Sequence, residues 1–328
     1  MRRREFIVSL AASAAAWPLV ARAQQVQKIP KVGYLWHAAS AKEENPYYGA
    51  VIEGFARLGY VNGRNIVLEH RFPNEKPELF AGMAAELVAM NPEVLMGGSV
   101  ASFYLNAATK TIPIVFMFVP DPVGMKLVNS LARPGGNITG LSNFGLDIAG
   151  KRVQLLKEIV PGLSRLAMLI NSNQQTASMY VEVTRKAARD LGVTVDAFDA
   201  LGSRKELDDA FDAMTKAGMQ AVIPAQGGTA FQWRAIIPRL AIEHRLPLCA
   251  FSRETFEDGA LISYGPDQVA LCVRSAALAD KIIKGEKPAD IPVEQPTKFE
   301  FLVNLRTARA LGLTVPAGML IAANEVVE

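Results

Sequence analysis

Short runs of β-branched and other apolar residues alternate along this chain with longer stretches in which apolar positions recur at helical spacing. That alternation is typical of a parallel sheet whose strands are connected by crossover helices. In the first part of the chain we expect strands at 31–36, 65–69, 93–96, 113–118 and 137–141, and helices near 46–58, 77–90, 99–109 and 123–131. This part of the chain therefore predicts one α/β unit.

The same alternation then starts again. We expect strands at 165–170, 194–198, 221–224, 247–251 and 260–264, with helices near 146–159, 176–191, 204–217 and 230–245. Tyr180, Val183, Ala187 and Leu191 fall on one face of the second of these helices, which predicts a buried stripe against a sheet. Two such units in series predict an α/β protein of two Rossmann-like lobes with parallel sheets and a cleft between them.

The last part of the chain is expected to cross between the lobes again. Gly265-Pro266 and the proline-punctuated segment 284–292 interrupt the pattern, and a strand at 298–303 with a short helix follows. We expect residues 29–141 and 265–290 to form the first lobe, and residues 142–264 and 291–328 the second. Three passages between the lobes would form a hinge that permits closure while limiting other motions.

The first residues have the pattern of an export signal. Three arginines precede an apolar, alanine-rich stretch from Val8 to Val20, and Ala21-Arg22-Ala23 has the small residues of a cleavage site. Arg3-Arg4-Glu5-Phe6-Ile7 resembles the twin-arginine signal, which directs export of folded proteins. We expect residues 1–23 to be a signal peptide cleaved after Ala23, with a disordered basic tail or an amphipathic surface helix as the alternatives.

Removing that segment changes how the charge is interpreted. The full chain has 35 basic and 32 acidic residues, and without residues 1–23 both numbers become 31. The basic excess therefore belongs to the signal, and it gives no reason to expect a nucleic-acid partner. No later segment approaches the ~20 apolar residues of a membrane span, so we expect a soluble mature protein with two cores.

Motifs for chemistry are mostly missing. Residues 145–151 match the glycine and lysine spacing of a phosphate-binding loop, but Arg152 stands where a Ser or Thr would hold magnesium. The three histidines are isolated and no pair has metal-ligand spacing, so we expect neither a metal nor another cofactor. For Cys249 and Cys272 we expect core packing, with a mutual disulfide as the alternative.

Polar residues do gather where the predicted strands end, and open α/β sheets bind ligands at that edge. Ser99 begins a helix, so its hydroxyl and the nearby N–H groups suit a carboxylate, whereas Asp121 suits an ammonium group. Ser99 and Asn171 have a second interpretation as helix caps, and Asp121 as the residue that fixes a Pro-Asp-Pro turn. The candidate ligand contacts at strand ends are His37, Ser40, Gly98, Ser99, Asp121, Asn171, Asn173, Gln226 and Ser252.

Three longer motifs resemble a known family. Residues 131–140 (LARPGGNITG), 263–267 (SYGPD) and 284–300 (KGEKPADIPVEQPTKFE) are similar, in this order, to signatures of the ABC-transporter substrate-binding proteins related to the tryptophan-binding TrpX group. The resemblance implies a type I periplasmic-binding-protein fold and a solute enclosed between the lobes. It also implies that Phe144, Tyr264 and Asp267, like Asp121, lie at or near the cleft and hinge.

From the residues and the resemblance together we expect a monomeric solute-binding protein of the periplasm. Its solute would be a small organic molecule such as an amino acid or aromatic carboxylate, and its partner an ABC permease in the inner membrane. The alternatives are an exported α/β hydrolase-type enzyme, for which no nucleophile and base pair is evident, and the ligand-sensing domain of a signalling system.

Overall fold

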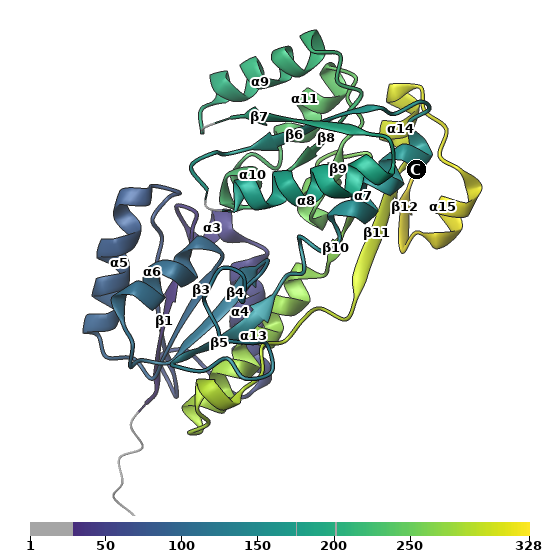
Figure 1. The fold of residues 1–328 in the computed structure, drawn as a ribbon. Helices are drawn as coiled ribbons and strands as arrows, with labels where there is room; N and C mark the ends of the chain where they lie inside the picture. Colours follow the sequence, from purple (N-terminus) through teal and green to yellow (C-terminus); the bar gives the residue numbers. More distant parts are fainter. Residues whose placement is uncertain (1–28, 175, 201) are drawn as a thin grey trace, which may run out of the picture.

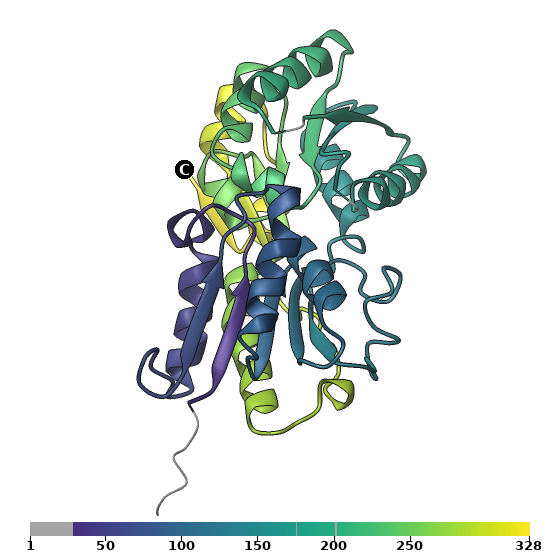
Figure 2. The same cartoon turned by 90° about the vertical axis from the view of Figure 1, so that its left-hand side faces the viewer.

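The computed structural model describes residues 29–174, 176–200 and 202–328, which form two lobes, one above the other (Figures 1 and 2). The first lobe contains a parallel sheet of five strands in the order β2-β1-β3-β4-β5. These strands are β1 (Lys31–Leu35), β2 (Val67–Arg71), β3 (Val94–Gly98), β4 (Ile114–Val119) and β5 (Ile138–Ser142). The parallel order agrees with the alternation of the sequence.

Helices cover both faces of this sheet, and α3 (Ala41–Glu44) follows β1. The helices α4 (Tyr47–Arg57) and α13 (Gln268–Ile283) lie on one face, and α5 (Pro77–Ala89) and α6 (Val100–Ala108) lie on the other. Successive strand residues face opposite sides: Met96 packs with the α4 and α13 cluster, and Leu95 packs with the α5 and α6 cluster. Because helices cover both faces of the sheet, its strands are buried on both sides. This explains why the strands are continuous apolar runs in the sequence.

The second lobe contains the parallel strands β7-β6-β8 and the strands β12-β11-β10-β9, linked by a parallel bridge between Val222 and Leu248. The pair β10 and β11 is antiparallel. The strands are β6 (Arg165–Ile170), β7 (Thr194–Asp199), β8 (Ala221–Pro224), β9 (Cys249–Ala250), β10 (Ile262–Pro266), β11 (Phe299–Asn304) and β12 (Glu325–Val327). The second sheet is thus parallel except where the chain returns through β11.

Its helices again form two layers. Residues of α7 and α8 pack on one face of the sheet, and residues of α9 and α11 pack on the other. The helices are α7 (Ala149–Ile159), α8 (Ala177–Asp190), α9 (Arg204–Lys216), α10 (Gly228–Gln232), α11 (Ile237–Glu243), α12 (Arg253–Glu257), α14 (Leu305–Leu311) and α15 (Ala317–Ala322), and a 3-10 turn spans Pro288–Asp290. Each lobe therefore has a core of its own.

The chain passes between the lobes three times. It leaves the first sheet after β5 to form α7 of the second lobe, and it returns after β10 to form α13. Ile291 and Val293 still pack in the first lobe, and Glu294 bridges to Leu141 before β11 joins the second sheet. The third passage therefore follows Glu294, and the expected boundary at 290 and 291 stays a prediction.

Two expected helices differ from the structure. Residues 123–131 form turns instead of a helix, because Asp121 Oδ1 accepts a hydrogen bond from the Gly124 N–H at 2.8 Å and Lys126 has a φ of 57°. The expected helix at 230–245 is divided into α10 and α11. Cys249 and Cys272 are free and buried in different lobes, which agrees with core packing.

Candidate ligand-binding site

A cavity of about 380 Å³ lies between the lobes, and both lobes contribute to its walls. On the first lobe the wall is mostly apolar. The rings of Phe80 and Tyr104 are stacked there with their centroids 5.1 Å apart, and Val100, Phe103 and Met125 extend the surface. These side chains come from α5, from α6 and from the turns that follow β4. Such a wall suits the apolar part of a small solute.

The wall on the second lobe is polar. Asn171 Nδ2 and Gln174 Nε2 both donate to the Thr229 hydroxyl, at 2.8 and 3.2 Å. Asn171 Oδ1 accepts a hydrogen bond from the Asn173 N–H at 3.0 Å. These hydrogen bonds hold the loop after β6 against the start of α10, so the amide and hydroxyl groups have fixed positions at the cavity.

Two helices start at the cavity without a side-chain cap from their own N-cap residue. Ser99 precedes α6 and Thr176 precedes α8, and neither side chain accepts a hydrogen bond from its helix. Free N–H groups and the helix dipole make such ends favourable for an anion. Ser99 also has a φ of 47° and a ψ of −122°, a conformation that a serine rarely adopts and that is more common at functional sites.

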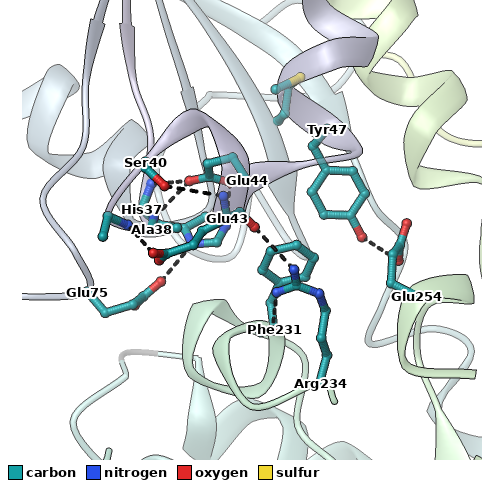
Figure 3. Close-up of polar contacts among 12 residues, drawn as sticks. His37, Ala38, Ser40, Glu43, Glu44, Tyr47, Glu75, Phe231, Arg234 and Glu254 are labelled. Carbon is teal, nitrogen blue, oxygen red and sulfur yellow. Dashed lines mark hydrogen bonds and ion pairs between the residues drawn. The ribbon is translucent and has the colours of Figure 1, made fainter. Parts of the chain in front are cut away.

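The charged groups at the cavity form one cluster (Figure 3). His37 lies between two carboxylates: its Nδ1 is 2.7 Å from Glu75 Oε1, and its Nε2 is 3.3 Å from Glu44 Oε2. Glu44 is fully buried, and its Oε1 accepts the backbone N–H groups of His37 and Ala38. Burial alone lowers the pKa of His37, but the two carboxylates outweigh it and raise this pKa to about 9. With His37 protonated, the cluster carries one net negative charge.

The carboxylate of Glu75 also reaches the second lobe. A Cβ atom at Gly228 would lie only 2.0 Å from Glu75 Oε1, so a larger residue at the start of α10 would displace this carboxylate. Glu75 itself has a φ of 53°, and its N–H donates to the His37 carbonyl at 2.7 Å. The loop after β2 therefore holds a carboxylate at the seam of the two lobes.

Further contacts join the lobes beside this cluster. Phe231 of α10 is 4% exposed and packs in the first lobe, with its ring 5.0 Å from that of Tyr47. The Arg234 guanidinium lies 4.0 Å above the Phe231 ring and donates to the Glu43 carbonyl at 3.3 Å. Tyr47 donates to Glu254 of α12 at 2.8 Å. Figure 3 shows these side chains facing one another, so the lobes are closed in this structure.

A second, smaller cavity of about 40 Å³ continues the first toward the hinge. His37, Ser99, Pro120, Thr176 and Gly228 line both cavities. The remaining wall combines aromatic rings with the side-chain amides of Asn143, Gln226 and Gln268.

The structure places five of the residues expected from the sequence at these cavities: His37, Ser99, Asn171, Asn173 and Gln226. The carboxyl ends of parallel strands lie at one edge of a sheet. Residues chosen because they follow such strands are therefore brought together by the fold.

The other expected residues line neither cavity and have other partners. Ser40, Ser252 and Asp267 accept hydrogen bonds at the starts of α3, α12 and α13, and Asp121 holds its turn. Gly98 is buried at the end of β3, with the Phe118 ring against it. The rings of Phe144 and Tyr264 each lie 6.1 Å from that of Phe299 at the passages between the lobes. A ligand contact by these residues stays a prediction.

Several residues at the cavity were not expected, and Glu75 is foremost among them. It follows β2, and the strand-end argument would have found it had it been applied to that strand. Thr176 was within reach of the same reasoning because it starts an expected helix. Gln174 lies in the same strand-end loop as Asn171 and Asn173, so it too was within reach. Phe80, Phe103, Tyr104, Gly228 and Thr229 carry no local signal, because an apolar or small residue of a helix has the same pattern whether it faces a core or a cavity.

Within the described part of the chain, no helix combines the length and apolar character that a membrane span needs. The described residues also include no group of three or more His, Cys, Asp or Glu side chains placed to hold a metal ion.

Two lobes, three passages between them and a cavity at their seam define a two-lobed solute-binding protein. Residues 40–327 match the family model described as ABC transporter substrate binding protein, so the chain belongs to that family. Its fold is that of the type I periplasmic binding proteins.

Individual relatives agree with this assignment. A tyrosine-binding protein of Clostridioides difficile (strain R20291) is 25% identical over 275 residues, covering 82% of this chain and 79% of the relative. A crystal structure of an ABC domain from Streptococcus pneumoniae in complex with L-Trp is 26% identical, with a TM-score of 0.83 over 91% of this chain and 99% of that one. A conserved domain protein from Vibrio cholerae is 27% identical, with a TM-score of 0.85 over 91% and 100%.

Proposed function

We propose that this protein is the exported solute-binding component of an ABC importer, and that its lobes close on an amino acid with an aromatic or other apolar side chain. The cavity between the lobes, with one apolar and one polar wall, is the observation that carries the proposal. Its volume of about 380 Å³ is at the small end of ligand pockets and suits a solute of amino-acid size. The printed ligands of two relatives, tyrosine and L-Trp, belong to the same class.

The polar groups at the cavity match the two charges of an amino acid. The start of α6 at Ser99, with the start of α8 beside it, suits the carboxylate. Among the described residues that line this cavity, Glu75 is the acidic side chain, and we assign it to the ammonium group. Asp121 is engaged in its turn, so Glu75 replaces it in this role. The apolar wall around Phe80 and Tyr104 then receives the side chain.

Export and transport complete the proposal. Residues 1–28 lie outside the described part of the chain, so the signal peptide is proposed from the sequence alone. N-terminal sequencing of the mature protein should give Gln24 as its first residue, and an uncleaved N-terminus would contradict the signal. Membership of the family supports delivery to an inner-membrane permease, and we propose that the protein acts without cofactor or enzymatic activity.

A thermal-shift screen tests the proposed solute class. The panel contains the protein amino acids, aromatic carboxylates without an amino group and aromatic amines without a carboxylate. A solute at ~100 times its dissociation constant adds about 2.7 kcal/mol to the free energy of unfolding, so a true ligand gives a clear rise in Tm. We expect aromatic or large apolar amino acids to give the largest rise.

Calorimetric titration of the best compound into two variants then tests the site. Ala107 lines the cavity and Ala108, its neighbour on α6, does not. Ala107→Trp should fill the space and weaken binding at least tenfold, whereas Ala108→Trp should bind as the wild type does. Equal affinities for all three proteins would contradict the site, and a panel without any binder would contradict the function.

A further inference from the structure

The smaller cavity at the hinge end has a chemical character that differs from the main cavity. Its polar groups are side-chain amides, hydroxyls and the His37 imidazole, and none of the described residues that line it is acidic. Because His37, Ser99 and Thr176 line both cavities, a solute in the main cavity has direct access to the smaller one.

Gln226 has an unused acceptor at this cavity. Its side chain is 8% exposed, and among the described residues its Oε1 has no hydrogen-bond partner. The backbone of its loop is fixed, since the N–H of the preceding Ala225 donates to the Leu169 carbonyl at 2.8 Å. A buried acceptor without a partner destabilises a protein by ~1–3 kcal/mol, so its presence in a cavity points to a ligand that supplies the donor.

Two more oxygens surround the same place. A Cβ atom at Gly145 would lie 2.5 Å from the Tyr180 hydroxyl, 3.0 Å from Gln226 Oε1 and 3.2 Å from Asn143 Oδ1. The orientation of the Asn143 amide is set by its own hydrogen bonds: Nδ2 donates to the Phe118 carbonyl, and Oδ1 accepts from the Gly145 N–H, both at 3.1 Å. Gly145 thus leaves room for three oxygens near one place. Those of Gln226 and Asn143 only accept hydrogen bonds, whereas the Tyr180 hydroxyl, which also has no partner among the described residues, can accept or donate.

The charges nearby decide which donor fits. The buried guanidinium of Arg152 interacts electrostatically with Tyr180, whereas the charge of His37 is already paired with the carboxylates of Glu44 and Glu75. One nearby cation and no lining carboxylate disfavour an ammonium group, because a buried charge needs an opposite partner. A carboxylate cannot pair with Gln226 Oε1 or Asn143 Oδ1, because its oxygens only accept hydrogen bonds. An uncharged donor, a hydroxyl or a primary amide, satisfies both conditions.

We infer that the hinge-end cavity is a specificity subsite in which Gln226 accepts a hydrogen bond from an uncharged hydroxyl or amide donor of the solute. This inference rests on the proposed function and adds to it the class of solute: an amino acid that carries such a donor at the end of its side chain. The main cavity binds the charged groups and the apolar part, and the subsite separates a hydroxylated solute from its deoxy analogue.

Matched pairs of solutes test the subsite. We would titrate L-tyrosine and L-phenylalanine, and 5-hydroxy-L-tryptophan and L-tryptophan, into the wild type and into Gln226→Leu, with Gln154→Leu on the exposed face of α7 as the control. The wild type and the control should bind the hydroxylated member of at least one pair about tenfold more tightly, since a buried acceptor left unpaired weakens binding by that order. Gln226→Leu should lose this preference and keep its affinity for the deoxy member.

The outcomes separate the subsite from the proposed function. If the deoxy and hydroxylated members bind the wild type equally, or if Gln226→Leu keeps the preference, the subsite is wrong and the proposed function stands. If no member of either pair binds any of the proteins, the subsite is wrong, and the thermal-shift panel then decides whether the proposed function stands. Without solute, Gln226→Leu should melt no lower than the wild type, because it removes an unpaired buried oxygen; a clearly lower Tm would make Gln226 a structural residue and overturn the subsite.

Discussion

At the scale of single residues, His37 combines three roles. It lines both cavities, its ring lies between Glu44 and Glu75, and its ring meets that of Phe231 edge to face at 5.5 Å. The imidazolium keeps two nearby carboxylates in place, one buried in the first lobe and one at the seam. A neutral residue at this position would leave them without a counter-charge, which a buried carboxylate requires.

The raised pKa of His37 predicts a dependence of stability on pH. Because its folded-state pKa of about 9 exceeds the unfolded value near 6.5, the ion pair stabilises the protein fully below about pH 6.5 and loses this effect as the pH rises through 9. Between pH 6 and pH 10 the free energy of unfolding should fall by about 3 kcal/mol more in the wild type than in His37→Gln. Urea unfolding at intervals from pH 6 to pH 10 measures the difference.

A matched control is His244→Gln. His244 lies on the second lobe, outside the cavities, with its Nδ1 2.9 Å from the Thr215 hydroxyl. This variant should keep the wild-type pH dependence. The same pH dependence in His37→Gln and in the wild type would show that the pair with Glu44 and Glu75 contributes nothing.

At the scale of elements, the short helix α10 links the lobes. Its first residue, Gly228, receives the carboxylate of Glu75, and Phe231 inserts beside Tyr47. Arg234, after the helix, covers the Phe231 ring. These contacts exist only when the lobes are closed, so α10 stabilises the closed arrangement without belonging to any of the three hinge passages.

We therefore expect Phe231→Ala to weaken solute binding while both lobes stay folded. Truncating a buried Phe destabilises its surroundings by ~3–5 kcal/mol, and here much of that loss falls on the closed state alone. When fewer molecules are closed, the apparent dissociation constant rises in proportion, and we expect at least a tenfold increase by calorimetry. Gln232→Ala, on the same helix but exposed, should bind as the wild type does. An unchanged affinity in Phe231→Ala would contradict the role of α10.

Elements were easier to predict from the sequence than contacts between them. The strands of the first sheet were predictable because parallel strands covered on both faces read as short apolar runs. The helix expected at 123–131 was wrong, because a turn held by Asp121 occupies its first residues, and Leu127 and Val128 are buried without it. Glu75 and Phe231 were not predictable as partners of the opposite lobe, since their contacts join segments more than 100 residues apart in the chain.

At the scale of the whole molecule, three passages connect two separately packed lobes, and the cavity lies where both lobes meet. Opening would break the contacts that join the lobes. These are the ring contact of Phe231 with Tyr47 and the hydrogen bonds from Arg234 to Glu43 and from Tyr47 to Glu254. A solute that touches both walls adds contacts which only the closed arrangement provides. Binding and closure are therefore coupled, as in other hinged receptors.

Hydrogen–deuterium exchange with and without the best solute of the screen tests this account most directly. If one solute is enclosed between the lobes, amides should become protected on both sides of the cavity: around Ser99 at the start of α6, around Thr176 at the start of α8, and from Gly227 to Phe231. Amides of the outer helix α9 should exchange at unchanged rates. Protection confined to one lobe, or lying away from these three segments, would contradict a solute held between the lobes.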